Sequence, residues 1–270
     1  MCDTNKKPRR LSLGVSSLIG TRPDQQDSVY GEVHKDSAMA VLCDGMGGLN
    51  GGALASQTAL QTFAEDYEKR DRTMKIPYFM RQEAIEMDTV VHELADEEQK
   101  LLGAGTTVVA AIIEQNALYW LSVGDSRIYI LRGKEIMAVN RDHNYRMRLD
   151  QALKSGEITK EVYEQEESKA EALISFLGIG NVSLMDINLE PFLLQPKDIV
   201  LLCSDGLYRT LSEEKIHEIC VSHFPDAQMA ADALTETAVL SSLTSQDNTS
   251  VVVIYYQEEE YPAQQVFHHI

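Results

Sequence analysis

Apolar and polar residues alternate along the chain with two periods, which divide it into predicted strands and helices. The segment from Leu11 to Ser17 alternates residue by residue, as expected of a strand at the edge of a sheet. Two helices are predicted next, because apolar residues recur there at intervals of three and four positions. These residues are Leu60, Phe63, Ala64 and Tyr67 in the first helix, and Met80, Ala84, Met87, Val91 and Leu94 in the second. The acidic residues of the second helix, Glu83 and Glu86 among them, are expected on its solvent-exposed face.

The rest of the chain repeats this order of strands followed by two helices. Short apolar runs predict strands over residues 106–113, 118–123 and 127–131, another ending at Cys203, and a closing strand from Val251. One helix is expected to open at Ser212, and a second to run from Met229 to Leu240. Helix pairs that follow groups of strands are typical of α+β proteins. We therefore predict a four-layer α-β-β-α sandwich of two antiparallel sheets flanked by helix pairs, in a single domain spanning residues 1–270.

One polar segment interrupts the pattern. From Asn140 to Ser168 the chain is polar and poor in core residues, and Gly156 breaks its helical stretch. We expect residues 144–177 to form a mobile flap over the rim of the sheets that takes part in substrate selection. Residues 257–270 are expected to form an irregular tail. His143, just before the flap, could act as a general acid, although histidines in such positions more often pack beneath a loop.

Four aspartates lie at the ends of predicted strands. Asp44 follows the apolar run that starts at Ser37, Asp205 follows the strand ending at Cys203, and Asp247 precedes the closing strand. Asp125 occupies the tight turn between two further strands. If the strands next to Asp205 and Asp247 pair antiparallel, these two acids share one rim.

A group of neighbouring acids of this kind is expected to bind cations. Neighbouring carboxylates repel one another by a few kcal/mol per pair, so they stay ionised only when positive charge balances them. The glycines after Asp44 let the backbone carbonyl of Gly45 face the same space. Carboxylate and carbonyl oxygens are ligands of hard cations, so we predict two divalent ions that share Asp44.

Composition narrows the functional classes. The chain has 270 residues and a formal net charge of -18, which argues against nucleic acid or an anionic membrane surface as a partner. No apolar stretch is long enough to span a bilayer or to serve as a signal peptide, so we expect a soluble cytoplasmic protein. The four cysteines lack metal-ligand spacing and are expected to be free. A zinc site made from Cys43 and Cys203 is a remote alternative.

Seven short elements carry a resemblance to a known family. They are Arg22-x3-Gln26-Asp27, Asp44-Gly45-Met46-Gly47-Gly48, Gly105-Thr106-Thr107, Gly124-Asp125-Ser126-Arg127, Asp142-His143, Asp205-Gly206 and Asp247-Asn248. In identity and order they resemble the metal-dependent protein serine/threonine phosphatases, the PPM or type 2C family, and its compact bacterial members above all. A single Asp-Gly would be a weak signal, whereas seven ordered elements from about Leu11 to Tyr255 are specific.

The resemblance implies roles for individual residues. Asp44 would bridge two Mn²⁺ or Mg²⁺ ions, the Gly45 carbonyl would complete one site, and Asp205 and Asp247 would hold the other ion. Asp125, with Asp205, would hold a possible third, weakly bound ion. Three further residues have implied roles outside direct ligation: Arg22 would bind the phosphoryl group, and Asp27 and Gln26 would orient metal-bound waters. Considered without the resemblance, Arg22 could simply pair with Asp24 or Asp27 on the surface.

The implied reaction is hydrolysis of phosphoserine and phosphothreonine in proteins by a metal-activated bridging water, which needs no side-chain nucleophile. The substrates would be phosphoproteins of a serine/threonine kinase, and we expect a monomer. The chain departs from the family at Met46 and Leu49, where relatives often have histidine, at Gln26, which replaces a frequent glutamate, and over residues 166–178. These departures leave open an alternative, a weak or inactive phosphatase-fold module that binds a phosphoprotein. A nucleotide-binding protein built on the Gly45–Gly52 loop is disfavoured, because no Gly-Lys-Ser/Thr follows.

Overall fold

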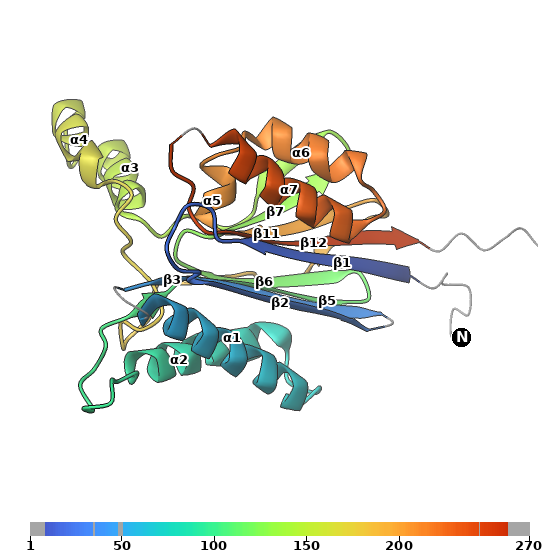
Figure 1. Cartoon of the computed structure of the whole chain (residues 1–270), viewed down its shortest axis with the longest axis horizontal. Coiled ribbons are helices and arrows are strands. Elements are labelled where there is room, and N and C mark those ends of the chain that lie inside the picture. Colours follow the sequence, from blue (N-terminus) through green and yellow to red (C-terminus); the bar gives the residue numbers. More distant parts are fainter. Residues whose placement is uncertain (1–8, 35, 48–50, 243, 259–270) are drawn as a thin grey trace, which may run out of the picture.

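Two antiparallel sheets lie face to face and form the centre of the molecule (Figure 1). The computed structural model describes residues 9–34, 36–47, 51–242 and 244–258, so Gly48, Leu49 and most of the predicted tail lie outside the described residues. The first sheet has the strand order β1 (Arg9–Leu18), β12 (Thr249–Glu258), β11 (Ile199–Cys203), β7 (Arg127–Arg132) and β8 (Glu135–Ala138). The order of the second is β10 (Phe192–Leu193), β6 (Ala117–Val123), β5 (Val108–Glu114), β3 (Ser37–Met46) and β2 (Asp27–His34), with β4 (Gly105–Thr106) on β3 and β9 (Asp186–Ile187) on β6.

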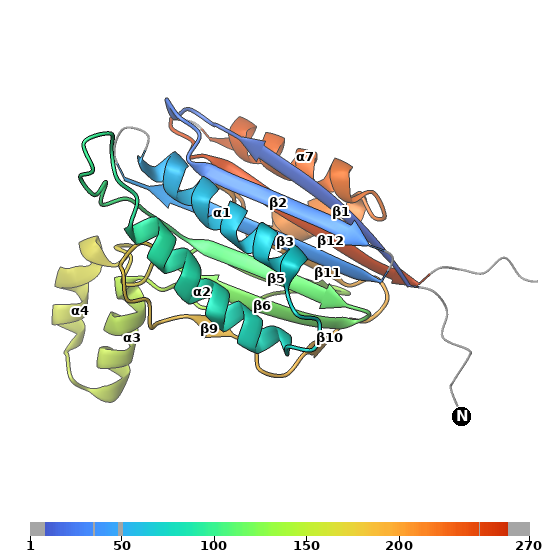
Figure 2. The same ribbon diagram turned by 90° about the horizontal axis from the view of Figure 1, so that it is seen from below.

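A pair of helices covers the outer face of each sheet. Helices α1 (Gly51–Lys69) and α2 (Ile76–His92) lie across the second sheet (Figure 2), and α6 (Glu213–Ser222) and α7 (Ala227–Ser241) lie across the first. The predicted four-layer sandwich is therefore confirmed. The predicted start of α6 is also confirmed, because the Ser212 side chain accepts a hydrogen bond from the Lys215 backbone N–H.

Three apolar cores hold the layers together. Val41 of β3 belongs to the core under α1 and α2, whereas its neighbour Leu42 belongs to the core between the sheets. A third core lies between the first sheet and helices α6 and α7. Because the central strands are buried on both faces, their sequences are continuous apolar runs without alternation.

Two local predictions are wrong. The strand expected over residues 106–113 is split into β4 and β5 at Thr107, whose side chain bonds to Asp44 and Ser126. Glu83 is 6% exposed and does not face solvent, because α2 packs that side against α1. None of the described helices combines the length and apolar character required to cross a membrane.

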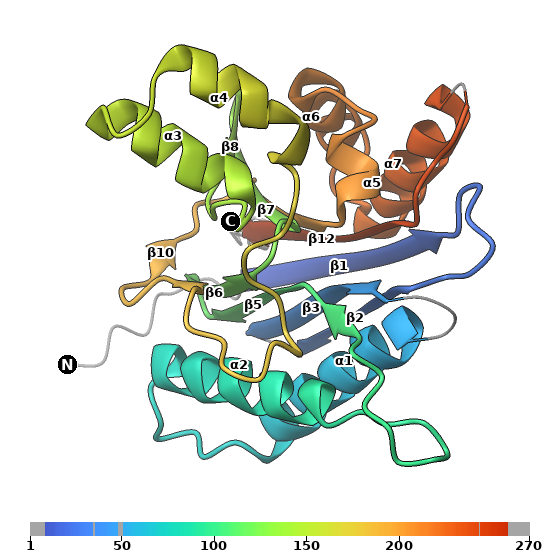
Figure 3. The same cartoon turned by 90° about the vertical axis from the view of Figure 1, so that its left-hand side faces the viewer.

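The polar segment projects from one end of the sandwich (Figure 1), the end that faces the viewer in Figure 3. It contains α3 (Tyr145–Ser155), α4 (Lys160–Glu166) and the 3₁₀ turn η1 (Glu167–Lys169). Gly156 ends α3 with a φ of 78°, a conformation that glycine adopts without strain. Leu149 is the one buried residue of α3, and α4 has none. This excursion therefore contributes little to the cores and is anchored where it leaves and rejoins the sheets, by the Asn144–Leu173 and Thr106–Leu177 bridges.

Candidate active site

The ends of several strands bring the predicted acidic residues to one rim. In the β11–β12 pair Cys203 lies opposite Val251, so Asp205 and Asp247 meet at the same end of the sheet, as the predicted antiparallel pairing requires. On the facing sheet, Asp27 lies directly opposite Asp44 in the β2–β3 pair. A pocket of about 400 Å³ opens between the two sheets. Its lining includes Arg22, Gln26, Asp44, Gly45, Asp125, Asp205 and Asp247.

The backbone of Asp44 is held by the two threonines of the β4–β5 junction. Its N–H donates to the Thr107 hydroxyl at 3.1 Å, and its carbonyl accepts from the Thr107 N–H and the Thr106 hydroxyl, both at 2.9 Å. The Thr107 hydroxyl also lies 2.8 Å from that of Ser126. Asp44 and the turn that carries Asp125 are thus connected through one threonine side chain.

Asn248 positions the loop that carries Arg22. Its side-chain amide donates to the carbonyls of Ile19 at 2.9 Å and Asp24 at 3.1 Å, and its carbonyl oxygen accepts from the Gln26 N–H at 2.8 Å. Arg22 itself donates to Asp247 at 2.6 Å, so its partner is neither Asp24 nor Asp27, the two surface partners considered from the sequence.

Gly45 is required by the close approach of two backbones. A Cβ atom at this position would lie 2.1 Å from the Gly52 carbonyl oxygen and 2.6 Å from that of Gln26. Both neighbours are backbone atoms at the start of α1 and beside β2, which cannot rotate away. The Asp-Gly sequence therefore fixes how β3 leaves the sheet towards the pocket.

Burial and mutual repulsion raise the pKa values of the clustered acids. Burial raises the pKa of Asp27 to about 7, against the opposing hydrogen bonds of two serine hydroxyls, and it raises that of Asp125 to about 6, to which Asp205 adds. The pKa of Asp44 is raised well above its usual value, mainly by burial and then by repulsion from Asp27 and Asp205. The pKa of Asp205 is raised by burial, although Arg209 opposes this. These acids therefore ionise together only when more positive charge is present than Arg22 and Arg209 supply.

Comparison with known proteins agrees with this arrangement. A family model described as protein phosphatase 2C matches residues 17–245, which is most of the chain. The chain belongs to the protein phosphatase 2C family. It is 30% identical to the protein phosphatase PhpP of Streptococcus pneumoniae over 258 residues, which covers 93% of this chain and 99% of that protein. It is also 30% identical to the serine/threonine phosphatase stp of Listeria monocytogenes over 219 residues, covering 80% and 83% of the two chains.

Solved structures of family members share the fold. The serine/threonine phosphatase PstP/Ppp of Mycobacterium tuberculosis has a TM-score of 0.74 at 26% identity, covering 92% of this chain and 99% of that one. The catalytic domain of the phosphatase PstP, solved in complex with two manganese ions, has a TM-score of 0.72 at 27% identity, covering 93% and 100%. The predictions of the family and of its α+β sandwich are therefore confirmed.

The side chains at the rim fit the hard divalent cations that the protein phosphatase 2C family implies. The candidate donors are carboxylates and the Gly45 carbonyl, and the described pocket lining contains no cysteine or histidine, although Met46 is part of it. One oxygen of Asp27, Oδ1, is buried without a hydrogen-bond partner among the described residues, which leaves an acceptor free beneath the site. In the described part of the chain no three acidic, histidine or cysteine side chains close around one point. Instead, Arg22 pairs with Asp247, and Arg209 pairs with both Asp125 and Asp205.

Three residues considered in the sequence lie away from this chemistry. His143 is fully buried: its Nδ1 accepts from the Gly124 N–H at 3.2 Å, and its Nε2 lies 3.4 Å from Asp186, so it packs beneath the rim and does not line the pocket. Cys43 belongs to the core under α1 and α2, whereas Cys203 belongs to the core under α6 and α7. The zinc alternative is wrong, because the two thiols are buried on opposite sides of the sandwich.

The sequence did not indicate the contacts of four residues at the site: Asn248, Thr107, Tyr208 and Arg209. Asn248 and Thr107 stood within quoted family elements without an assigned role. Arg209 follows Asp205 by four positions, a spacing at which opposite charges meet on a helix, so a search for such pairs would have found it. Nothing in the local sequence indicated its second partner, Asp125.

Proposed function

We propose that this protein is a metal-dependent phosphatase that hydrolyses phosphoserine and phosphothreonine in proteins. The single observation that carries the proposal is the convergence of Asp44, Asp125, Asp205 and Asp247, from distant parts of the chain, on one pocket. Relatives named as serine/threonine phosphatases support it, as does the relative solved with two manganese ions.

Asp44, the Gly45 carbonyl, Asp205 and Asp247 would hold two Mn²⁺ or Mg²⁺ ions. When bound, such ions supply a hydroxide nucleophile near neutral pH and neutralise charge on the phosphoryl oxygens. The Asp44 N–H donates to the Thr107 hydroxyl and the Asp44 carbonyl accepts from the Thr106 hydroxyl, which holds the residue in place, so the ligands need little reorganisation.

Arg22 would bind the phosphoryl group at the mouth of the pocket. Its side chain is 57% exposed and its partner Asp247 is 38% exposed, so their ion pair is worth little and exchanges easily for a phosphate. The planar guanidinium group has five N–H donors and can grip two phosphate oxygens at once. Asp27 and Gln26 would support the site from behind. Asp27 would do so through the free Oδ1, which can accept a hydrogen bond from an ordered water.

Residues 144–177 would form a flap that selects substrates. Two residues of this segment, Glu171 and Leu173, line the pocket, while most of its surface is exposed. Its divergent sequence affects which phosphoprotein binds and leaves the acidic rim unchanged. We further propose that the protein is a cytoplasmic monomer that opposes a serine/threonine kinase; light scattering that shows a stable dimer would contradict the first point.

Manganese-dependent hydrolysis of a phosphothreonine peptide tests the proposal. Asp205→Asn should lower kcat/KM by at least about 100-fold, because a buried charge at the reaction centre is lost. The matched control is Asp36→Asn, which makes the same change in the exposed β2–β3 turn at the opposite end of the strands from Asp44. Full activity of Asp205→Asn, or of the wild-type protein in excess chelator, would refute the proposal. The binding-only module predicts no turnover in the wild type, and the convergence of the acids on one pocket favours the enzyme.

A further inference from the structure

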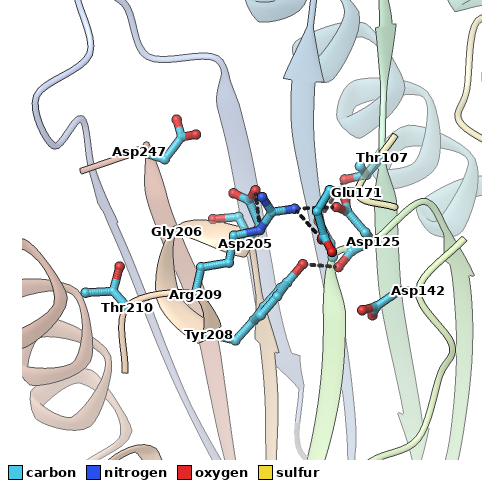
Figure 4. Close-up of polar contacts among 12 residues, drawn as sticks. Thr107, Asp125, Asp142, Glu171, Asp205, Gly206, Tyr208, Arg209, Thr210 and Asp247 are labelled. Atoms are coloured by element: carbon cyan, nitrogen blue, oxygen red, sulfur yellow. Dashed lines mark hydrogen bonds and ion pairs between the residues drawn. The ribbon is translucent and has the colours of Figure 1, made fainter. Parts of the chain in front are cut away.

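One guanidinium group lies inside the acidic pocket, between carboxylates from different elements. Arg209 directly follows the short helix α5 (Asp205–Tyr208), and its Nε lies 3.1 Å from Asp205 Oδ2. Its Nη2 lies 3.2 Å from Asp125 Oδ2 and 3.4 Å from Glu171 Oε2. Figure 4 shows the guanidinium reaching from Asp205 across to Asp125 and Glu171. Asp125 and Asp205 are therefore joined by a cation that belongs to the protein.

Tyr208, the residue before Arg209, also holds the Asp125 turn in position. The Tyr208 hydroxyl donates to the backbone carbonyl of Asp125 at 3.0 Å. The tyrosine ring lies under the guanidinium of Arg127, 3.7 Å from the ring centroid, and Arg127 forms two hydrogen bonds to Asp142. Tyr208 thus binds the backbone of Asp125 while the next residue, Arg209, binds its carboxylate. The Asp125–Arg209 ion pair therefore belongs to a network of hydrogen bonds and charge contacts, unlike an isolated ion pair on the surface.

The net charge of the pocket lining matches that of two divalent ions. Six carboxylates and two guanidinium groups line it, so its formal charge is -4 when every group is ionised. Two divalent cations balance this charge. A third would have to bind at Asp125 and Asp205, next to the positive charge of Arg209, and would be repelled by it.

We propose that Arg209 is a built-in cation that takes Asp125 out of metal ligation, so that this chain holds two divalent ions and excludes a third. The proposal rests on the proposed metal-dependent function. It assigns a different role to Asp125 than the resemblance to the family implied, because the arginine occupies the space between the two carboxylates. The contact of the same guanidinium with Glu171 also ties the flap to the pocket rim.

Counting bound Mn²⁺ tests this inference without measuring turnover. Free Mn²⁺ is followed by electron paramagnetic resonance during titration of the wild type, Arg209→Ala, Arg209→Lys and the double variant Arg209→Ala/Asp125→Asn. The control is Arg146→Ala, which removes another arginine partner of Glu171 but touches neither aspartate. Circular dichroism establishes that each variant is folded.

The wild type, Arg209→Lys and Arg146→Ala should each bind two ions. Arg209→Ala should bind a third ion, at least about tenfold more tightly than any further ion binds to the wild type. In the double variant, Asp125→Asn should abolish binding of this third ion. A third ion in the wild type that depends on Asp125, or two ions only in Arg209→Ala, would overturn the inference and leave the proposed function intact. A wild type that binds no Mn²⁺ would overturn both.

Discussion

Glu83 gives the protein a pH-dependent stability that does not involve the active site. Its side chain lies between α2 and α1, and its Oε2 has no hydrogen-bond partner among the described residues. Burial, with repulsion from Asp66 and Glu86, raises its pKa from 4.5 to about 7. Because the folded state holds this proton more tightly than the unfolded state does, ionising Glu83 destabilises the fold. The penalty is absent well below pH 4.5, grows as the pH rises, and is complete above about pH 7.

Replacing Glu83 by glutamine should remove this penalty. A pKa rise from 4.5 to about 7 corresponds to about 3 kcal/mol in full, and partial solvation reduces what is expected to about 1–3 kcal/mol. Glu83→Gln should therefore gain less than about 1 kcal/mol over the wild type at pH 5, where little of the penalty has developed, and about 1–3 kcal/mol at pH 8. Urea unfolding of both proteins in chelator, at several pH values, measures the difference. The aspartates of the rim titrate in both proteins, so their contribution cancels.

Glu86→Gln is the matched control for this series. Glu86 lies on the exposed side of the same helix, and its replacement should change stability by only a few tenths of a kcal/mol at either pH. A stability gain of Glu83→Gln that is the same at pH 5 and pH 8 would refute the reasoning, because it could not arise from ionisation. A loss at pH 8 would refute it as well.

Two further predictions concern the active site. Asn248→Ala removes three hydrogen bonds to the Arg22 loop, so it should lower the free energy of unfolding by about 2–4 kcal/mol and also lower kcat/KM. Urea unfolding measures the first effect and peptide hydrolysis the second. An unchanged stability would show that other contacts hold the loop. Leu173→Ala shortens a flap side chain at the pocket, so KM should rise more for a phosphothreonine peptide than for a small aryl phosphate. Equal changes for the two substrates would argue against a flap that selects proteins.

The sequence alone determined the layers of this protein. Strands buried on both faces, such as β3, need continuous apolar runs, and helices that cover a sheet on one side need a single apolar stripe. Both patterns are local and can be read directly from the chain. The positions of the acids at the strand ends were also predictable from local sequence, because a residue just after a buried strand must leave the sheet at its rim. Their common rim was predicted from the antiparallel order of two strands, and the β11–β12 register confirmed it.

Only the tertiary structure decided which side chains meet. Glu83 has the sequence environment of an exposed helix face, yet the packing of α2 on α1 buries it. Thr107 interrupts a strand because its hydroxyl serves both Asp44 and Ser126, which are far from each other in the chain. Arg209 could be paired with Asp205 from spacing, but its contact with Asp125 depends on how α5 meets the β6–β7 turn. Periodicity reports only the side on which a residue lies, whereas hydrogen bonds and ion pairs depend on distances of a few ångströms between segments that the sequence does not relate.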